Sequence, residues 1–114
     1  MITPGGQFVN YGLSFVRATP YRCTGKLTSQ KSCEVMTTPK AELNSPQYGY
    51  GFAIDTAQSV VGHNGGFPGI SSNLDMFKGT GYTAVVLSNY GGASRAVVEK
   101  IRALVRSRAA ATSP

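Results

Sequence analysis

Several features that would place a sequence in a class at once are missing here. The 114 residues contain no run of about 18 apolar residues, so no membrane-spanning helix is expected. No apolar stretch follows Met1, so no signal peptide is recognised. The absence of a signal peptide leaves the cellular location unknown.

Residues that bind metals are scarce as well. The chain has one histidine, His63, and two cysteines, Cys23 and Cys33. Two cysteines with no histidine near them do not make a zinc site, so we expect no metal and no other cofactor. In an oxidising compartment the two cysteines would form a disulfide, whereas elsewhere they would stay thiols, and the sequence leaves both open.

Acidic residues are few, with 5 Asp and Glu against 11 Lys and Arg, which gives a net charge of +6. Nucleic acid is the obvious partner for a basic chain. However, no stacking aromatic residues interleave with the basic residues near the C-terminus, and no nucleic-acid recognition module is present. We therefore interpret this charge as a solvated helix face and expect no nucleic-acid partner.

What remains is the composition of one globular domain, with 41% apolar and 14% charged residues over residues 1–114. Residues 1–47 are predicted to be a helical segment with two short helices. Apolar spacing predicts the first over residues 8–18. The second, over residues 31–37, would be capped by Thr28 or Ser29 and ended by Pro39.

Between residues 48 and 90 the pattern changes to short antiparallel strands. Alternation or a continuous apolar run predicts strands over residues 50–55, 59–63, 70–77 and 82–88. The last run is apolar throughout, so we expect it to be covered on both faces. Turns are expected at residues 56–58, 65–69 and 78–81.

A C-terminal helix is expected over residues 93–108, with Ser94 as its cap. Its apolar face has helical spacing and comprises Val97, Val98, Ile101, Leu104 and Val105. Residues 109–114 are expected to form a frayed tail. The predicted fold class is α+β: an antiparallel sheet of about four strands, two short N-terminal helices and the C-terminal helix packed on the sheet.

The single histidine stands at the start of the segment His63-Asn64-Gly65-Gly66-Phe67-Pro68-Gly69. A lone ionisable side chain followed by glycines and a proline is unusual in a plain strand, so we interpret it as the edge of an active-site cleft. The alternative is a buried or half-buried strand histidine that hydrogen bonds a backbone carbonyl.

The segments YGYGF, GHNGGFPGISSNLDMF and YTAVVLSN together resemble the serine β-lactamase-like family. That family includes class C β-lactamases, penicillin-binding-protein-like D,D-peptidases and related esterases, many of them periplasmic or extracellular. Its motifs are S-x-x-K, which carries the nucleophile, then Y-x-N, and then K-T-G or H-x-G on a central strand. His63-Asn64-Gly65 matches the H-x-G form, and the resemblance covers the C-terminal third of a family member.

The resemblance implies a catalytic site that includes His63, Asn64, Gly65 and Gly66. His63 would lie beside the nucleophile and the substrate carboxylate, where a histidine can donate a hydrogen bond or move a proton. Asn64 would point away from the substrate or lie beside it, and Gly65 would let the strand approach the nucleophile's helix. The N–H of Gly66 would be the second donor to the oxyanion.

The first two family motifs are absent. No S-x-x-K occurs; the strings at residues 28–31 and 37–40 have threonine instead and follow the expected position of the nucleophile. Ser71-Ser72-Asn73 spells S-x-N, but it follows the third motif, and we interpret it as part of a strand.

The sequence thus predicts the C-terminal part of a β-lactamase-like serine hydrolase. The parent reaction would be acyl transfer from a β-lactam, a D-amino-acid peptide or an ester, and these residues alone would be inactive. The expected partners are the missing N-terminal portion of the hydrolase or a second copy of the chain. The alternative is a non-catalytic ligand-binding or assembly domain with the same fold.

Overall fold

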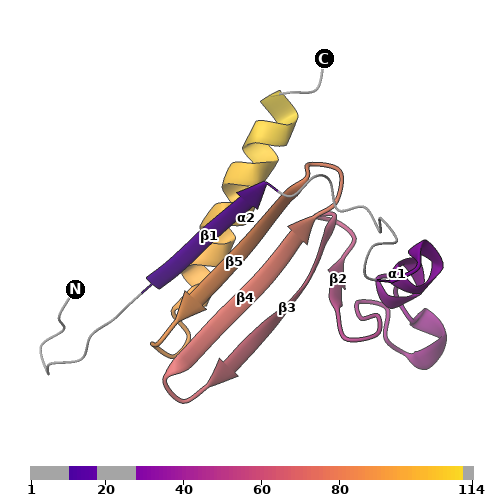
Figure 1. The fold of residues 1–114 in the computed structure, drawn as a ribbon, viewed down its shortest axis with the longest axis horizontal. Helices are drawn as coiled ribbons and strands as arrows, with labels where there is room; N and C mark the ends of the chain where they lie inside the picture. Colours follow the sequence, from indigo (N-terminus) through magenta and orange to yellow (C-terminus); the bar gives the residue numbers. More distant parts are fainter. Residues whose placement is uncertain (1–10, 18–27, 112–114) are drawn as a thin grey trace, which may run out of the picture. The chain divides into compact units, whose positions relative to one another are not determined.

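The structure is a computed structural model that describes the backbone of residues 11–17 and the whole of residues 28–111. The strands form a five-stranded sheet in the order β1-β5-β4-β3-β2. The elements follow one another as β1 (Tyr11–Arg17), α1 (Gln30–Met36), the 3-10 helix η1 (Ala41–Leu43), β2 (Ala53–Asp55), β3 (Val60–Phe67), β4 (Ile70–Phe77), β5 (Tyr82–Ser88) and α2 (Ser94–Ala111) (Figure 1). The predicted α+β class, the antiparallel strands from β2 to β5 and the C-terminal helix are confirmed.

The described chain divides into two compact units. One contains β1 as far as Val16, residues 64–74 and residues 84–111. The other contains residues 28–63 and 75–83, together with Arg17. Each unit has its own set of buried apolar side chains, so each is described separately.

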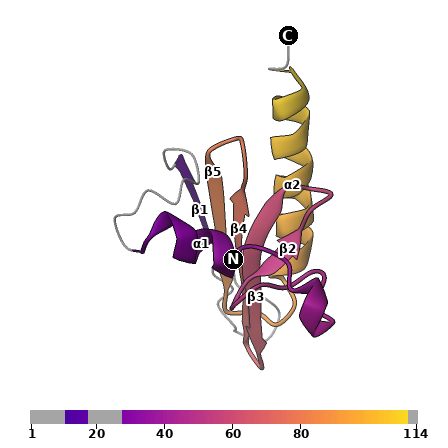
Figure 2. The ribbon, with the colours of Figure 1, turned by 90° about the vertical axis from the view of Figure 1, so that its right-hand side faces the viewer.

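In the first unit, α2 lies along one face of the strands (Figure 2). Val98, Ile101 and Val105 are buried at helical spacing, and Ala84 and Val86 of β5 are buried as well. Burying each of the valine and isoleucine side chains contributes about 1.5–3 kcal/mol. The buried stripe is narrower than predicted, because Leu104 is exposed and Val97 is only half-buried.

The prediction that β5 is covered on both faces is wrong. Successive side chains of a strand point to opposite faces. Ala84, Val86 and Ser88 are buried, whereas Val85 is half-buried and Leu87 is 57% exposed. The apolar run in the sequence therefore forms a strand that is covered on one face only.

A pair of buried serines joins the start of α2 to β4. Ser71 and Ser94 are only 6% and 7% exposed, and their hydroxyl oxygens are 2.5 Å apart. The backbone N–H of Ser94 also donates to Ser71 Oγ at 3.2 Å. Ser94 is the first residue of α2, whereas the sequence predicted it as the residue that caps the helix. The helix continues to Ala111, so the predicted frayed tail is wrong for residues 109–111, and residues 112–114 lie outside the described residues.

The predicted helix over residues 8–18 is wrong, because Tyr11–Arg17 is strand β1 beside β5. Tyr11, Leu13 and Phe15 recur at the period of two that is typical of a strand, and Gly12 disfavours a helix. The remaining ends of that prediction, residues 8–10 and 18, lie outside the described residues. The local sequence pattern of this segment fits both a helix and a strand. Pairing with β5, which is distant in sequence, favours the strand.

The second unit contains α1, η1 and β2. The hydroxyl of Ser29 accepts the N–H of Ser32 at 3.1 Å, which makes Ser29 the predicted cap of α1. The buried apolar residues of this unit are Ile54, Val60, Val61 and Phe77. β2 is shorter than predicted and pairs antiparallel with the start of β3 through Ala53–Gly62, Ile54–Val61 and Asp55–Val60.

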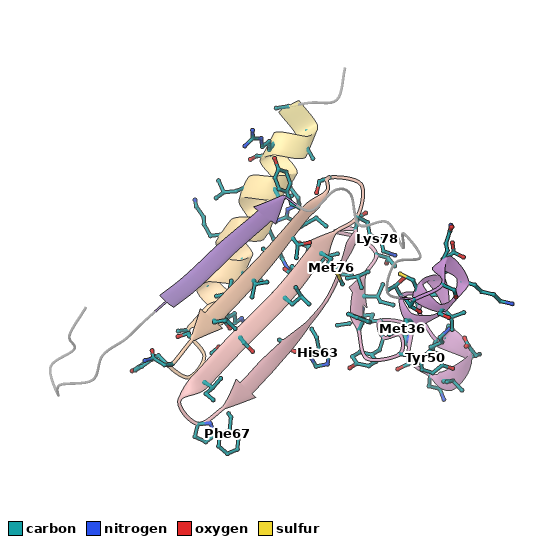
Figure 3. All side chains as sticks on the ribbon, in the orientation of Figure 1. Met36, Tyr50, His63, Phe67, Met76 and Lys78 are labelled. Carbon is teal, nitrogen blue, oxygen red and sulfur yellow. The ribbon has the colours of Figure 1, made fainter. Side chains whose placement is uncertain are left out.

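Strand β3 is longer than predicted. It runs through Asn64, Gly65 and Gly66 to Phe67, so the predicted turn over residues 65–69 shrinks to Pro68 and Gly69. Gly69 has φ of 81°, and a proline followed by a glycine with positive φ is the pattern of a type II turn. The two earlier glycines therefore lie within a strand. Figure 3 shows Phe67 at the end of β3, beside this turn.

The Ser71–Ser94 pair gives a prediction about stability. Ser71→Ala removes the acceptor of the Ser94 N–H and leaves two polar groups buried without that partner, so the free energy of unfolding should fall by about 1–3 kcal/mol. The neighbouring change Ser72→Ala, at a half-buried hydroxyl, should cost no more than about 0.5 kcal/mol. Urea unfolding followed by circular dichroism measures both. Equal losses in the two variants would contradict this role for the buried pair.

Candidate functional site

The four residues predicted to form a site, His63, Asn64, Gly65 and Gly66, are consecutive on β3, and all four are exposed. Figure 3 shows the His63 side chain beside this strand. The alternative interpretation, a buried or half-buried strand histidine, does not fit the exposed side chain of His63. Their role at a catalytic site remains a prediction.

His63 is hydrogen bonded to a tyrosine that lies 15 positions earlier in the sequence. The Tyr48 hydroxyl oxygen lies 2.7 Å from His63 Nε2. The two rings meet edge to face, with centroids 5.8 Å apart and an interplanar angle of 78°. Tyr48 is 37% exposed, so the pair lies at the surface with part of the phenol ring covered.

Backbone pairing brings Tyr48 to this position. Tyr48 forms an isolated antiparallel bridge with Ala53, the first residue of β2. Ala53 pairs in turn with Gly62, the residue before His63. The segment that carries Tyr48 is thus added beside β2, and the phenol reaches His63 because both are held to the same short strand.

The loop around Tyr48 is held by further backbone hydrogen bonds. The N–H of Lys40 donates to the Tyr48 carbonyl at 3.0 Å, and the N–H of Tyr48 donates to the Ser45 carbonyl at 3.2 Å. The next residue, Gly49, is buried, and its N–H donates to the Phe52 carbonyl at 2.8 Å. A Cβ atom at Gly49 would lie only 2.0 Å from the carbonyl oxygen of Met36, so only glycine fits there.

A second tyrosine lies just beyond Gly49. Lys40 Nζ lies 4.9 Å from the centroid of the Tyr50 ring, within the range of a cation–π contact. Tyr50 is exposed, as are Tyr48 and His63. The two tyrosines of the YGYGF segment therefore lie at the surface of this unit beside Lys40, whereas Phe52 is half-buried.

In the other unit, Gly65 lies close to β4. The Ser72 hydroxyl donates to the Gly65 carbonyl at 3.3 Å. A Cβ atom at Gly65 would lie 2.9 Å from Ser72 Oγ, whereas one at Gly66 would come no nearer than 3.9 Å to the Ile70 carbonyl oxygen. Gly65 is thus the more constrained of the two glycines. Residues 71–73 are part of β4, which confirms that the S-x-N string is strand.

The threonine strings that look like a nucleophile motif have structural roles. Residues 28–31 include Ser29, which caps α1, and the first two residues of that helix. At the end of that helix, the Thr37 hydroxyl donates to the Cys33 carbonyl at 3.0 Å and the Thr38 hydroxyl to the Glu34 carbonyl at 2.6 Å. Both hydroxyls therefore satisfy carbonyls of the last helical turn. Cys33 is disulfide-bonded, and Cys23, the only other cysteine of the chain, lies outside the described residues.

Sequence reasoning missed the bond between Tyr48 and His63. No spacing rule predicts a contact between residues 48 and 63, which are separated by a loop, a short strand and a turn. The available signal was the tyrosine at the start of the YGYGF segment. Glycines in such a segment indicate that another part of the backbone lies close to it. Gly49 does lie close to the Met36 carbonyl group.

No protein-family model matches the chain, and no curated protein or solved structure matches it either. Over the described residues, no helix has the length and apolar character needed to cross a membrane. Within the same part of the chain, no group of three or more His, Cys, Asp or Glu residues is arranged to hold a metal ion. The family resemblance therefore rests on the sequence motifs alone.

The close approach at Gly49 gives a prediction about the loop that holds Tyr48. Gly49→Ala places a methyl group against the Met36 carbonyl oxygen, so the free energy of unfolding should fall by about 2 kcal/mol or more. Gly91→Ala is the matched control, because a Cβ there meets nothing within 4 Å and Gly91 is not among the positive-φ glycines. Thermal unfolding measures both. A Gly49→Ala variant as stable as Gly91→Ala would show that the loop does not approach α1 so closely.

Proposed function

We propose that this chain supplies the third-motif strand of a β-lactamase-like acyl-transfer site. In this proposal β3 forms one wall of the site with His63, Asn64, Gly65 and Gly66. The nucleophilic serine and its activating lysine come from a segment that these 114 residues do not contain. The substrate is a β-lactam, a D-amino-acid peptide or a small ester.

The observation that carries the proposal is that His63, at the start of the H-x-G string on β3, is exposed and hydrogen bonded to Tyr48. An exposed imidazole that is held by a 2.7 Å hydrogen bond presents a defined donor or acceptor to a ligand. The antiparallel strands and the C-terminal helix are also compatible with the family's α+β fold. These features support the wall of a site without supplying its nucleophile.

The chemistry follows from what acyl transfer requires: a nucleophile, a base for its proton, and donors for the oxyanion. His63 would hydrogen bond the substrate's carboxylate or move a proton beside the nucleophile. The Gly66 N–H would donate to the oxyanion. An oxyanion donor contributes about 3–4 kcal/mol in the transition state, but only when a nucleophile creates that oxyanion.

The proposed partner is accordingly the nucleophile-bearing portion of such a hydrolase, with a second copy of the chain as the alternative. A non-catalytic domain that only binds the same ligands is the rival function. Only the catalytic function predicts acyl transfer once a nucleophile is supplied. Both functions predict that the described residues bind the ligand through His63.

The first prediction from this proposal concerns covalent chemistry. Incubation of the chain with benzylpenicillin, and separately with an activated phenyl ester, should leave the intact mass unchanged because no S-x-x-K serine is present. Mass spectrometry of the folded protein measures this. A stoichiometric adduct on one serine would mean that the chain carries its own nucleophile, and the proposed division of the site would be wrong.

The second prediction concerns binding. Acetyl-D-alanyl-D-alanine should shift the amide resonances of His63 and its neighbours in a saturable manner. His63→Ala should weaken the binding by about tenfold to a hundredfold, since one hydrogen bond to a charged group contributes about 1.5–3 kcal/mol. The L,L-dipeptide controls for stereochemistry, and Gly91→Ala controls for remote changes. Binding that is unaffected by His63→Ala, or no binding at all, would overturn the proposal.

A further inference from the structure

We infer that Tyr48 is a positioning residue for His63: its hydroxyl donates to Nε2 and holds the neutral imidazole in the form that carries its proton on Nδ1. The inference deepens the proposed function, and its catalytic meaning rests on that function. The hydrogen bond itself is a property of the chain alone, so it can be tested without any ligand or reaction.

The first support is how firmly the phenol is held. Backbone hydrogen bonds from Lys40 and to Ser45 fix Tyr48 on both sides, and the bridge to Ala53 ties it to β2. The N–H of Tyr50 donates to the Met36 carbonyl at 3.0 Å, which anchors the following residues to the end of α1. The hydroxyl is therefore carried by a constrained loop and is not at the end of a freely moving segment.

The second support is that two contacts fix the imidazole together. A single hydrogen bond would leave the ring free to turn about the line that joins the two atoms. The two rings also meet with the edge of one against the face of the other, at an interplanar angle of 78°. The bond of 2.7 Å and the ring contact therefore define both the position of Nε2 and the tilt of the ring.

The direction of the bond follows from acid–base chemistry. A phenol O–H is a stronger donor than a neutral imidazole N–H, and an unprotonated imidazole nitrogen is a stronger acceptor than a phenol oxygen. The favoured arrangement is therefore O–H donating to Nε2, which leaves the ring proton on Nδ1. A neutral imidazole in water prefers the opposite form, with its proton on Nε2. Tyr48 thus selects the ring nitrogen through which His63 donates.

The experiment is nitrogen-15 spectroscopy of the imidazole at a pH where His63 is neutral. The chain contains one histidine, so a protein without added histidines gives one pair of ring nitrogen signals. In the unmodified chain Nδ1 should resonate at the upfield position of a protonated ring nitrogen and Nε2 at the downfield position of an unprotonated one. In Tyr48→Phe, Nε2 loses its donor, so the Nε2 signal should move upfield and the Nδ1 signal downfield.

Tyr50→Phe is the matched control. It removes a hydroxyl two residues away on the same loop and keeps the ring that contacts Lys40. The His63 signals should not change in this variant. A comparable change in Tyr50→Phe would assign the effect to the loop and would overturn the role of the Tyr48 hydroxyl.

Two other outcomes contradict the inference. One is a ring pattern in the unmodified chain with the proton on Nε2, and this measurement stands even if Tyr48→Phe fails to fold. The other is an unchanged pattern in a folded Tyr48→Phe variant. Because no ligand is present in these spectra, a failure of the dipeptide to bind would count against the proposed function and leave this inference standing.

Discussion

Strand pairing is the constraint on which the rest of the structure depends. A hydrogen-bonded ladder fixes which residues of neighbouring strands lie side by side, and the alternation of side chains then decides which face each one occupies. Pairing between β2 and β3 sets Ala53 against Gly62 and so places His63 just beyond the first residue of β2. The bridge from Tyr48 to Ala53 extends that pairing by one more segment, which brings the phenol to the imidazole.

Because of the same alternation, two adjacent serines of β4 have different surroundings. Ser71 is buried and hydrogen bonds Ser94 at the start of α2, whereas the half-buried Ser72 donates to the carbonyl of Gly65. Two adjacent hydroxyls thus have unrelated roles, one in attaching a helix and the other in linking β4 to the strand of the candidate site. Neither role requires a catalytic serine, which agrees with the proposal that the nucleophile comes from elsewhere.

Glycine has two different functions near the candidate site. Gly49 permits a close backbone approach to Met36, and Gly69 permits the positive φ of the turn after Pro68. Gly65 and Gly66 have no positive φ and continue β3 as strand residues, although a Cβ atom at Gly65 would lie 2.9 Å from Ser72 Oγ. Because these two residues have no side chains, the part of β3 that follows Asn64 can be approached closely by another backbone segment.

The sequence by itself determined the later elements well, because their signals are local. The turn residues at 78–81 and the apolar spacing of residues 97–105 predicted β4, β5 and α2 with few errors, and Ser29 was one of two predicted caps for α1. Tertiary structure decided the rest. Residues 11–17 became a strand because β5 offered a partner, β3 passed through two glycines because neighbouring strands supplied its hydrogen bonds, and Leu87 stayed exposed because only one face of β5 is covered. The Tyr48–His63 pair belongs to the same class, since a contact between residues 15 positions apart depends on register, and register is fixed only when the strands pair.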